Sequence, residues 1–389
     1  MSRRIDQALN IDELREIARR RLPRFAFDYV DGGSEDEATL AGNRASFERL
    51  RFRPRTLIDV SVRDTSTRIL GQPASFPAIV GPTGLNGLQW PDGDLAIARA
   101  AAAAGLPFAM STVSMSYIED LVKATSGRLW LQAYVFRERE ISDRLIDRAA
   151  AAGCEAIIIT SDFPTAGKRE RDFRSGLLPK QEFPLRTKLN ILRHPWWVLT
   201  VARNRPRFVN VERELGPGAN VNAFVGHGMF DPSLDWDDLA RFRDRWKGKL
   251  LLKGVLRGDD AEHAVGIGVD GVWLSNHGGR QLDRAISGMD ALPEVIAAVG
   301  DRTTVIVDGG IRRGSDIAKA VALGAAAVAL GRAPVYGLGA GGQAGATMAL
   351  EILRDEFDRT LALTGCRRVA DLTPDLVAGM GGSSLSAST

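Results

Sequence analysis

The chain contains few of the residues that build disulfide scaffolds or metal sites. Its 389 residues include two cysteines and four histidines. Two cysteines exclude a disulfide-stabilised framework and fit a reducing compartment. Neither cysteine stands at a metal-ligand spacing and the histidines are scattered, so we expect no metal site.

Long apolar runs and a charge excess of either sign are also missing. No run of about eighteen apolar residues occurs, and the N-terminus lacks the apolar core of a signal peptide. Lysine and arginine number 51 against 48 acidic residues, a net charge of +3 that is too small to indicate nucleic-acid binding. We expect a cytoplasmic protein with no nucleic-acid partner and a flexible Gly/Ser-rich tail over 381–389.

Short apolar runs alternate with helical patterns from about residue 76, which indicates parallel strands joined by helices. Eight units favour a (β/α)8 barrel over a doubly wound sheet. We expect one domain over 1–380, with a helical cap at 1–75, the barrel at 76–364, and a long insertion at 165–234 after strand four. The predicted strands are Ala78–Gly81, Phe108–Ser111, Trp130–Val135, Ala156–Thr160, Leu250–Gly254, Gly271–Ser275, Thr304–Val307 and Ala327–Leu330.

Polar residues concentrate at the ends of these strands, where barrel enzymes carry their active sites. In Ser275–Gln281, His277 and Arg280 are separated by two glycines that let the backbone approach a ligand. A base beside a carboxylate clamp suggests proton abstraction from a bound acid. The alternative is a strand-end turn whose His and Arg only satisfy their neighbours.

Two glycine-rich segments, Asp308–Gly314 and Gly331–Arg332, follow strands seven and eight. Backbone amides in these loops form the phosphate site of many barrels, and Arg312 and Arg332 could add charge. Asp308 fits hydroxyl groups better than a phosphate. Tight turns with solvated arginines are the alternative.

Lys253 interrupts an apolar run, so this cation is expected to face an anionic or electron-accepting ligand. A Schiff-base lysine and a lysine that reaches the barrel rim remain open.

Four further residues could complete an acid-binding site. Arg169 and Arg280, from different strands, would grip a carboxylate. Tyr134 could donate to a developing charge, and Asp162 could orient His277. For Tyr29, the residues alone favour core packing.

Together these segments resemble the FMN-dependent 2-hydroxy acid oxidase and dehydrogenase family. The resemblance runs from Leu22–Tyr29 through Phe52–Arg55 to Leu363–Cys366, and Ser275–Asp283 (SNHGGRQLD) is similar to the family's active-site signature. Within the family, the chain looks most like the mandelate dehydrogenases over Gly81–Gly87 and Gly167–Asp172.

The resemblance implies oxidation of an (S)-2-hydroxy acid, mandelate-like or otherwise aromatic, to the 2-oxo acid with FMN as cofactor. His277 is then the base and Asp162 its partner, Tyr134 contacts the hydroxyl, and Arg280 is the fourth catalytic residue. Tyr29, Arg169 and Arg280 hold the carboxylate. The implied FMN contacts are Pro82, Thr83, Gly84, Ser111, Gln132, Thr160, Lys253, Ser275, Asp308, Gly309, Gly310, Arg312, Gly331 and Arg332.

The resemblance also implies an electron acceptor, a membrane contact and an oligomeric state. Electrons go to a quinone or to oxygen, and Gly84 favours a dehydrogenase because many oxidases of the family carry alanine there. Residues 180–215, with Trp196 and Trp197 near basic residues, predict a peripheral contact with the inner face of the cell membrane. A lid or an oligomer contact is the alternative, and a homotetramer is implied.

Three other functions stay open: an oxygen-using oxidase or L-lactate dehydrogenase of the same family, a non-redox phosphate-binding barrel that uses Lys253, and a catalytically silent membrane-docking module.

Overall fold

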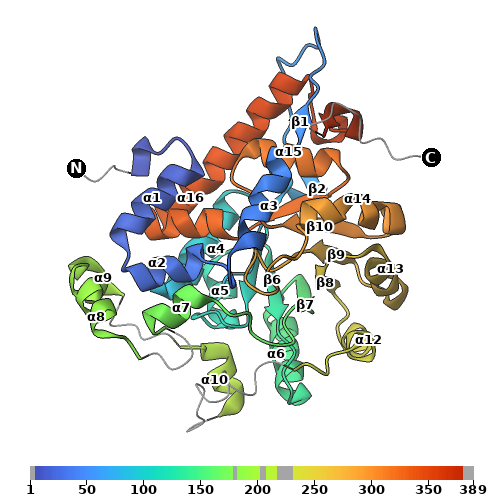
Figure 1. Cartoon of the computed structure of the whole chain (residues 1–389). Helices are drawn as coiled ribbons and strands as arrows, with labels where there is room; N and C mark the ends of the chain where they lie inside the picture. Colours follow the sequence, from blue (N-terminus) through green and yellow to red (C-terminus); the bar gives the residue numbers. More distant parts are fainter. Residues whose placement is uncertain (1–4, 178–181, 202–206, 217–230, 380–389) are drawn as a thin grey trace.

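Eight parallel strands close into a barrel at the centre of the molecule (Figure 1). The computed structural model describes residues 5–177, 182–201, 207–216 and 231–379. Chain neighbours pair around the barrel, and the circle closes between β11 and β4, which confirms the predicted (β/α)8 fold. The barrel strands are β4 (Ala78–Val80), β5 (Phe108–Ser111), β6 (Leu129–Ala133), β7 (Ala156–Thr160), β8 (Lys249–Val255), β9 (Gly271–Leu274), β10 (Thr304–Asp308) and β11 (Ala327–Leu330).

The strands form because their apolar, often β-branched residues are covered on both faces. In β7, for example, all five residues are buried, as expected for a parallel strand between a barrel core and outer helices. Two boundaries differ from the prediction. Tyr134 lies just beyond β6, and Lys253 lies inside β8, where the register with β9 shifts between Lys253 and Val255.

An outer layer of helices follows the strands (Figure 1). The last of these helices is the longest, and it contains a kink where Gly341 and Gly342 leave helical geometry. The helices are α4 (Gly93–Ala103), α5 (Ile118–Ala124), α6 (Arg139–Ala152), α12 (Trp236–Arg245), α13 (Gly258–Ile267), α14 (Gly288–Val299), α15 (Gly314–Ala322) and α16 (Arg332–Thr364).

The N-terminal segment begins with three helices, α1 (Ile11–Arg21), α2 (Arg24–Asp31) and α3 (Ala38–Glu48). Beyond them the expectation of helix up to residue 75 is wrong, because short strands follow. β1 (Arg51–Phe52) pairs with β12 (Val377–Ala378), and β2 (Thr67–Ile69) forms a hairpin with β3 (Gln72–Ala74). The tail predicted at 381–389 lies outside the described residues.

The described residues of the long segment between β7 and α12 include four short helices (Figure 1). They are α7 (Glu170–Ser175), α8 (Leu185–Leu192), α9 (Pro195–Thr200) and α10 (Val209–Leu215). Helices α7 and α8 pack against α2, so this segment covers the same end of the barrel as the N-terminal helices.

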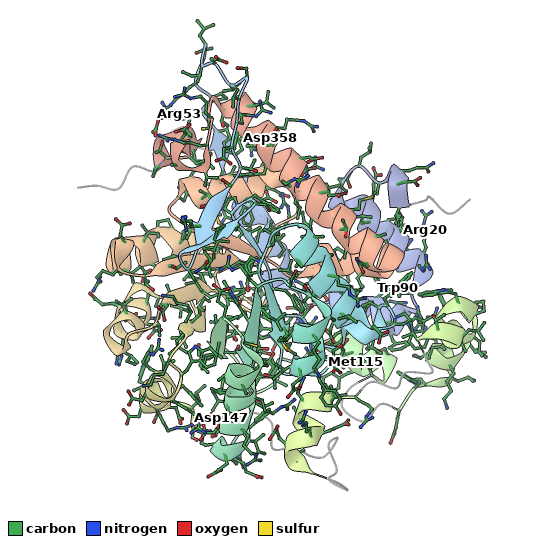
Figure 2. The ribbon with its side chains drawn as sticks, turned by 180° about the vertical axis from the view of Figure 1, so that it is seen from behind. Arg20, Arg53, Trp90, Met115, Asp147 and Asp358 are labelled. Atoms are coloured by element: carbon green, nitrogen blue, oxygen red, sulfur yellow. The ribbon has the colours of Figure 1, made fainter. Side chains whose placement is uncertain are left out.

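The expected membrane-facing role is wrong for Trp197, whose indole packs on protein, whereas Trp196 is partly buried against other side chains. Trp197 is buried, and its Nε1 donates to the carbonyl of Leu88 at 2.8 Å. Trp196 lies 4.7 Å from Trp90, ring centre to ring centre, and Arg21 lies over both rings. Figure 2 labels Trp90 on the side of the molecule where α8 and α9 lie.

Candidate active site

A cavity of about 600 Å³ opens where the carboxyl ends of the barrel strands meet the N-terminal helices and the long insertion. Most residues predicted for the site line it: Tyr29, Pro82, Thr83, Gly84, Ser111, Gln132, Tyr134, Thr160, Arg169, Lys253, His277, Arg280, Asp308, Gly309, Gly310, Arg312, Gly331 and Arg332. The two others, Asp162 and Ser275, stand behind this wall and hydrogen-bond residues that line it.

His277 is held from several directions. Its φ of +57° is left-handed, a conformation that a non-glycine residue adopts only where surrounding contacts hold it. Its backbone N–H donates to Ser275 Oγ at 3.0 Å. The ring lies between Asp162 Oδ1, 3.1 Å from Nδ1, and Tyr134 Oη, 3.3 Å from Nε2. The imidazole therefore has one nitrogen on a carboxylate and the other beside the cavity.

Burial and charge set the protonation of this pair. Burial lowers the pKa of His277, and the attraction of Asp162 offsets that only in part. Burial opposes ionisation of Asp162, yet Lys253 and His277 leave the pKa of its carboxyl below its usual range. The ground state is thus a neutral imidazole against a carboxylate, the arrangement of a general base with its orienting partner.

Two arginines approach the same region. Arg280 donates to the carbonyls of Tyr29 and Gly32 at 2.6 and 3.2 Å, and its guanidinium lies 4.9 Å from the Tyr29 ring centre. The Arg169 guanidinium lies 5.9 Å from that ring centre, and its Nε is 3.3 Å from Asp172. Burial, reinforced by Arg169, lowers the pKa of Arg280. Two cations held this close together favour a bound carboxylate.

Lys253 belongs to a polar cluster at the cavity wall. Its Nζ donates to Ser275 Oγ at 2.7 Å, and Ser275 Oγ donates to Asp308 Oδ2 at 2.9 Å. Lys253 Nζ lies 3.6 Å from that same Asp308 oxygen. The lysine is buried together with Ser275 and does not extend to the barrel rim.

A second chain of hydrogen bonds crosses three strand ends. Ser111 Oγ donates to Gln132 Oε1 at 2.9 Å, and Gln132 Nε2 donates to Thr160 Oγ1 at 2.8 Å. These side chains are buried and line the cavity. They offer a row of small polar groups along one side of a ligand.

The other half of the cavity suits a phosphate. Gly309 and Gly310 have φ of +90° and +87°, and a Cβ on Gly310 would lie 2.1 Å from the carbonyl of Asn43. Only glycine permits this close packing, and both glycines line the cavity. A Cβ added to Gly331 would have no other atom within 4 Å, so the space beside this glycine is open.

Two arginines frame this half. Arg312 lies over the ring of Tyr336 and donates to the carbonyl of Ile311 at 2.8 Å. Arg332 donates to the carbonyls of Val30, Gly32 and Gly278, each at 2.8 Å, and burial lowers its pKa to about 10. These bonds use three of the five N–H groups of Arg332, so two remain for an anion.

An FMN molecule fits these donors. Buried Asp308 Oδ1 has no hydrogen-bond partner among the described residues, as expected of an acceptor for a ligand hydroxyl. The two arginines, Arg312 and Arg332, and the glycines of the loops after β10 and β11 stand at one end of the cavity. Lys253 and the small polar side chains at the strand ends stand at the other.

The cavity also has an apolar side that the sequence interpretation did not locate. Its members share aliphatic or aromatic side chains and come from the strand-end loops and the insertion: Leu85, Val113, Phe163, Phe173, Leu177 and Phe208. Asp172 was missed as well. Its position three residues after Arg169, one helical turn along, was the available signal.

The described residues contain no group of three or more His, Cys, Asp or Glu side chains arranged to hold a metal ion. Fold and cavity together define a flavin-dependent oxidoreductase built on a (β/α)8 barrel. The chain belongs to the FMN-dependent dehydrogenase family, whose model matches residues 18–379, and FMN is its cofactor.

Relatives with assigned activities cover nearly the whole chain. It is 42% identical to (S)-mandelate dehydrogenase of Pseudomonas putida over 96% of this chain and 94% of the relative. It is 43% identical to an L-lactate dehydrogenase of Caulobacter vibrioides, over 94% of this chain and 96% of that one. The crystal structure of the monotopic membrane protein (S)-mandelate dehydrogenase superposes with a TM-score of 0.92 at 42% identity, over 96% of this chain and 100% of the other.

Proposed function

We propose that the protein oxidises an (S)-2-hydroxy acid with an aromatic side chain to the 2-oxo acid, and passes the electrons to a membrane quinone. The observation that carries this proposal is the position of His277, between Asp162 and the cavity and beside two arginines. FMN, when bound, supplies the two-electron acceptor for the α-carbon of the substrate.

Each polar residue has one task in this reaction. Arg169 and Arg280 bind the substrate carboxylate, with Tyr29 beside them. Tyr134 hydrogen-bonds the hydroxyl group, and Nε2 of His277 accepts the hydroxyl proton. Asp162 keeps the other nitrogen protonated and stabilises the imidazolium that forms.

The apolar side of the cavity supports an aromatic substrate. A phenyl ring could pack among Val113, Phe163 and Phe208, whereas the methyl group of lactate would leave that side unfilled. We expect Phe208→Ala to raise KM for (S)-mandelate about tenfold and to change KM for L-lactate much less. An equal rise for both acids would contradict the aromatic assignment.

The insertion supports a membrane contact through its leucines. Leu185, Leu189, Leu192 and Leu199 of α8 and α9 are between 51% and 72% exposed, and basic residues lie among them. Buried Trp197 and partly buried Trp196 hold α9 against the protein, while these leucines face outward. No described helix is long and apolar enough to cross a membrane, so the proposed contact is peripheral, on the cytoplasmic face.

Vesicle flotation tests this contact. The native protein should float with phosphatidylglycerol-containing vesicles, and Leu185→Ser/Leu189→Ser should remain at the bottom. Leu57→Ser/Val62→Ser removes apolar side chains that are even more exposed from a different part of the molecule and should float as the native chain does. Flotation of all three proteins would refute the assignment to α8.

One anaerobic assay tests the reaction. Bleaching of the flavin absorbance should be fastest with (S)-mandelate and slower with L-lactate and glycolate. The bleached enzyme should then pass electrons to a soluble quinone faster than to oxygen. Stoichiometric hydrogen peroxide in air would favour the alternative, an oxygen-using oxidase, and fastest bleaching by lactate would favour an L-lactate dehydrogenase. We further propose that the protein is a homotetramer, which light scattering would test.

A further inference from the structure

Trp273 is a buried tryptophan whose indole reaches Asp308, a residue that lines the cavity. It lies in β9 between Lys253 of β8 and Ile306 of β10, and it is fully buried. Because alternate residues of a strand face the same side, Trp273 points the same way as Ser275. Its Nε1 donates to Asp308 Oδ2 at 2.9 Å. It does not line the cavity, so it acts on a ligand through its neighbours, of which Asp308 is its hydrogen-bond partner.

The two oxygens of Asp308 have different surroundings. Oδ2 accepts from Trp273 and Ser275 and lies 3.6 Å from Lys253 Nζ. Oδ1 is buried and has no partner among the described residues. The indole and the serine therefore hold one oxygen inside the barrel wall, which leaves the other for a hydroxyl group in the cavity.

We propose that Trp273 is a positioning residue for FMN, which holds Asp308 so that Oδ1 accepts from a ribityl hydroxyl. The inference rests on the proposed function, because it requires that FMN lie along β9 and β10. The indole also competes with Lys253 for Oδ2. A carboxylate that lost this donor would move toward the ammonium group, and less of the lysine's charge would then stabilise reduced FMN.

The chain offers a matched control in Trp130. It is also fully buried in a barrel strand, and its Nε1 donates to a carboxylate, Glu155 Oε2, at 3.0 Å. Glu155 precedes β7, at the end of the barrel opposite the cavity. Replacing either tryptophan by phenylalanine removes the same atoms from a similar position, so the general cost of the substitution is common to both variants.

The test compares FMN affinity. Apoproteins of the native chain, Trp273→Phe and Trp130→Phe are titrated with FMN, and quenching of flavin fluorescence gives the dissociation constant. We expect Trp273→Phe to raise it about tenfold, the effect of one hydrogen bond to a charged acceptor. Trp130→Phe should stay within about twofold of the native value. The reduction potential of bound FMN should become more negative in Trp273→Phe alone.

A double-mutant cycle separates positioning from packing. If Trp273 acts through Asp308, Trp273→Phe in an Asp308→Asn background should change FMN affinity by less than about twofold. Additive losses, or equal losses in the two tryptophan variants, would overturn the inference.

A measurement on the native tryptophan covers the case in which Trp273→Phe does not fold. Among the indole N–H resonances of the seven tryptophans, Asp308→Asn should shift one and Glu155→Gln a different one. No shift in Asp308→Asn would overturn the inference. If the native apoprotein binds no FMN, the proposed function fails; if it binds FMN and the tryptophan variants behave alike, only the role of Trp273 fails.

Discussion

Replacing Asp162 with asparagine should slow flavin reduction while leaving FMN bound. Asp162 stands behind the cavity wall and contacts the site through Nδ1 of His277. An asparagine side chain could still accept one hydrogen bond there, but it would carry no charge to stabilise the imidazolium that forms when the substrate loses its proton.

The size of the effect follows from the contact. Two unit charges 3.1 Å apart attract by about 5 kcal/mol at an effective dielectric constant of about 20. Lys253 already offsets part of the charge of Asp162, and the remaining hydrogen bond retains another part. We therefore expect a loss of about 3 kcal/mol in the transition state, which is a reduction rate lower by roughly two orders of magnitude.

The pH profile should change in a defined direction. Asp162 raises the pKa of His277, so its removal lets the neutral imidazole persist to lower pH. The acid limb of the rate profile for Asp162→Asn should thus move to lower pH, although the rate is lower throughout.

Anaerobic stopped-flow measurement of flavin bleaching between about pH 5 and 9 is the assay. Asp172→Asn is the matched control, because this buried carboxylate pairs with Arg169 instead of His277. Asp172→Asn should alter KM for the substrate and leave the acid limb of the pH–rate profile where it is in the native protein. A rate for Asp162→Asn within about threefold of native, or an unmoved acid limb, would refute the reasoning.

Three further predictions concern single residues. Arg280→Lys should lower kcat/KM for the hydroxy acid about 100-fold, since lysine cannot replace the guanidinium fork; steady-state kinetics with saturating acceptor checks this, and unchanged KM and kcat would contradict the clamp. Gly84→Ala places a Cβ 2.5 Å from Val113 Cγ2, so the loop must shift, and we expect about 2 kcal/mol lower unfolding free energy with an altered ratio of oxygen to quinone turnover. Because the folded-state pKa of His277 lies below its ordinary value of 6.5, the unfolded chain binds the proton first, and stability is lost as pH falls below that value. Urea denaturation at about pH 7.5 and 5.5 should show this loss in the native apoprotein and a smaller one in His277→Gln.

Much of the barrel and the residue types of its site could be predicted from local sequence. Each strand is a short apolar run, and each run ends in polar residues. Parallel strands place their carboxyl ends at one face, so residues as distant in sequence as Pro82 and Arg332 had to meet there once eight strands were counted.

Contacts between distant segments could not be predicted. Tyr29 reaches the arginines because α2 packs over the barrel, and no local pattern distinguishes this tyrosine from one in a core. Composition favoured a membrane-facing role for Trp196, yet Trp90 and Arg21, from elsewhere in the chain, cover part of its ring. The position of Phe208 at the cavity was missed because it also depends on how a distant segment packs.

The sequence by itself determined the fold class and showed that His277, Asp162 and the glycine-rich segments follow strand ends, because strand periodicity and glycine's left-handed conformation are local properties. Only the tertiary structure decided which apolar side chains line the cavity, which oxygen of Asp308 has no partner among the described residues, and which described side chains of the insertion face outward. Those features depend on packing between segments that are far apart along the chain, and a side chain's partners are set by three-dimensional contact.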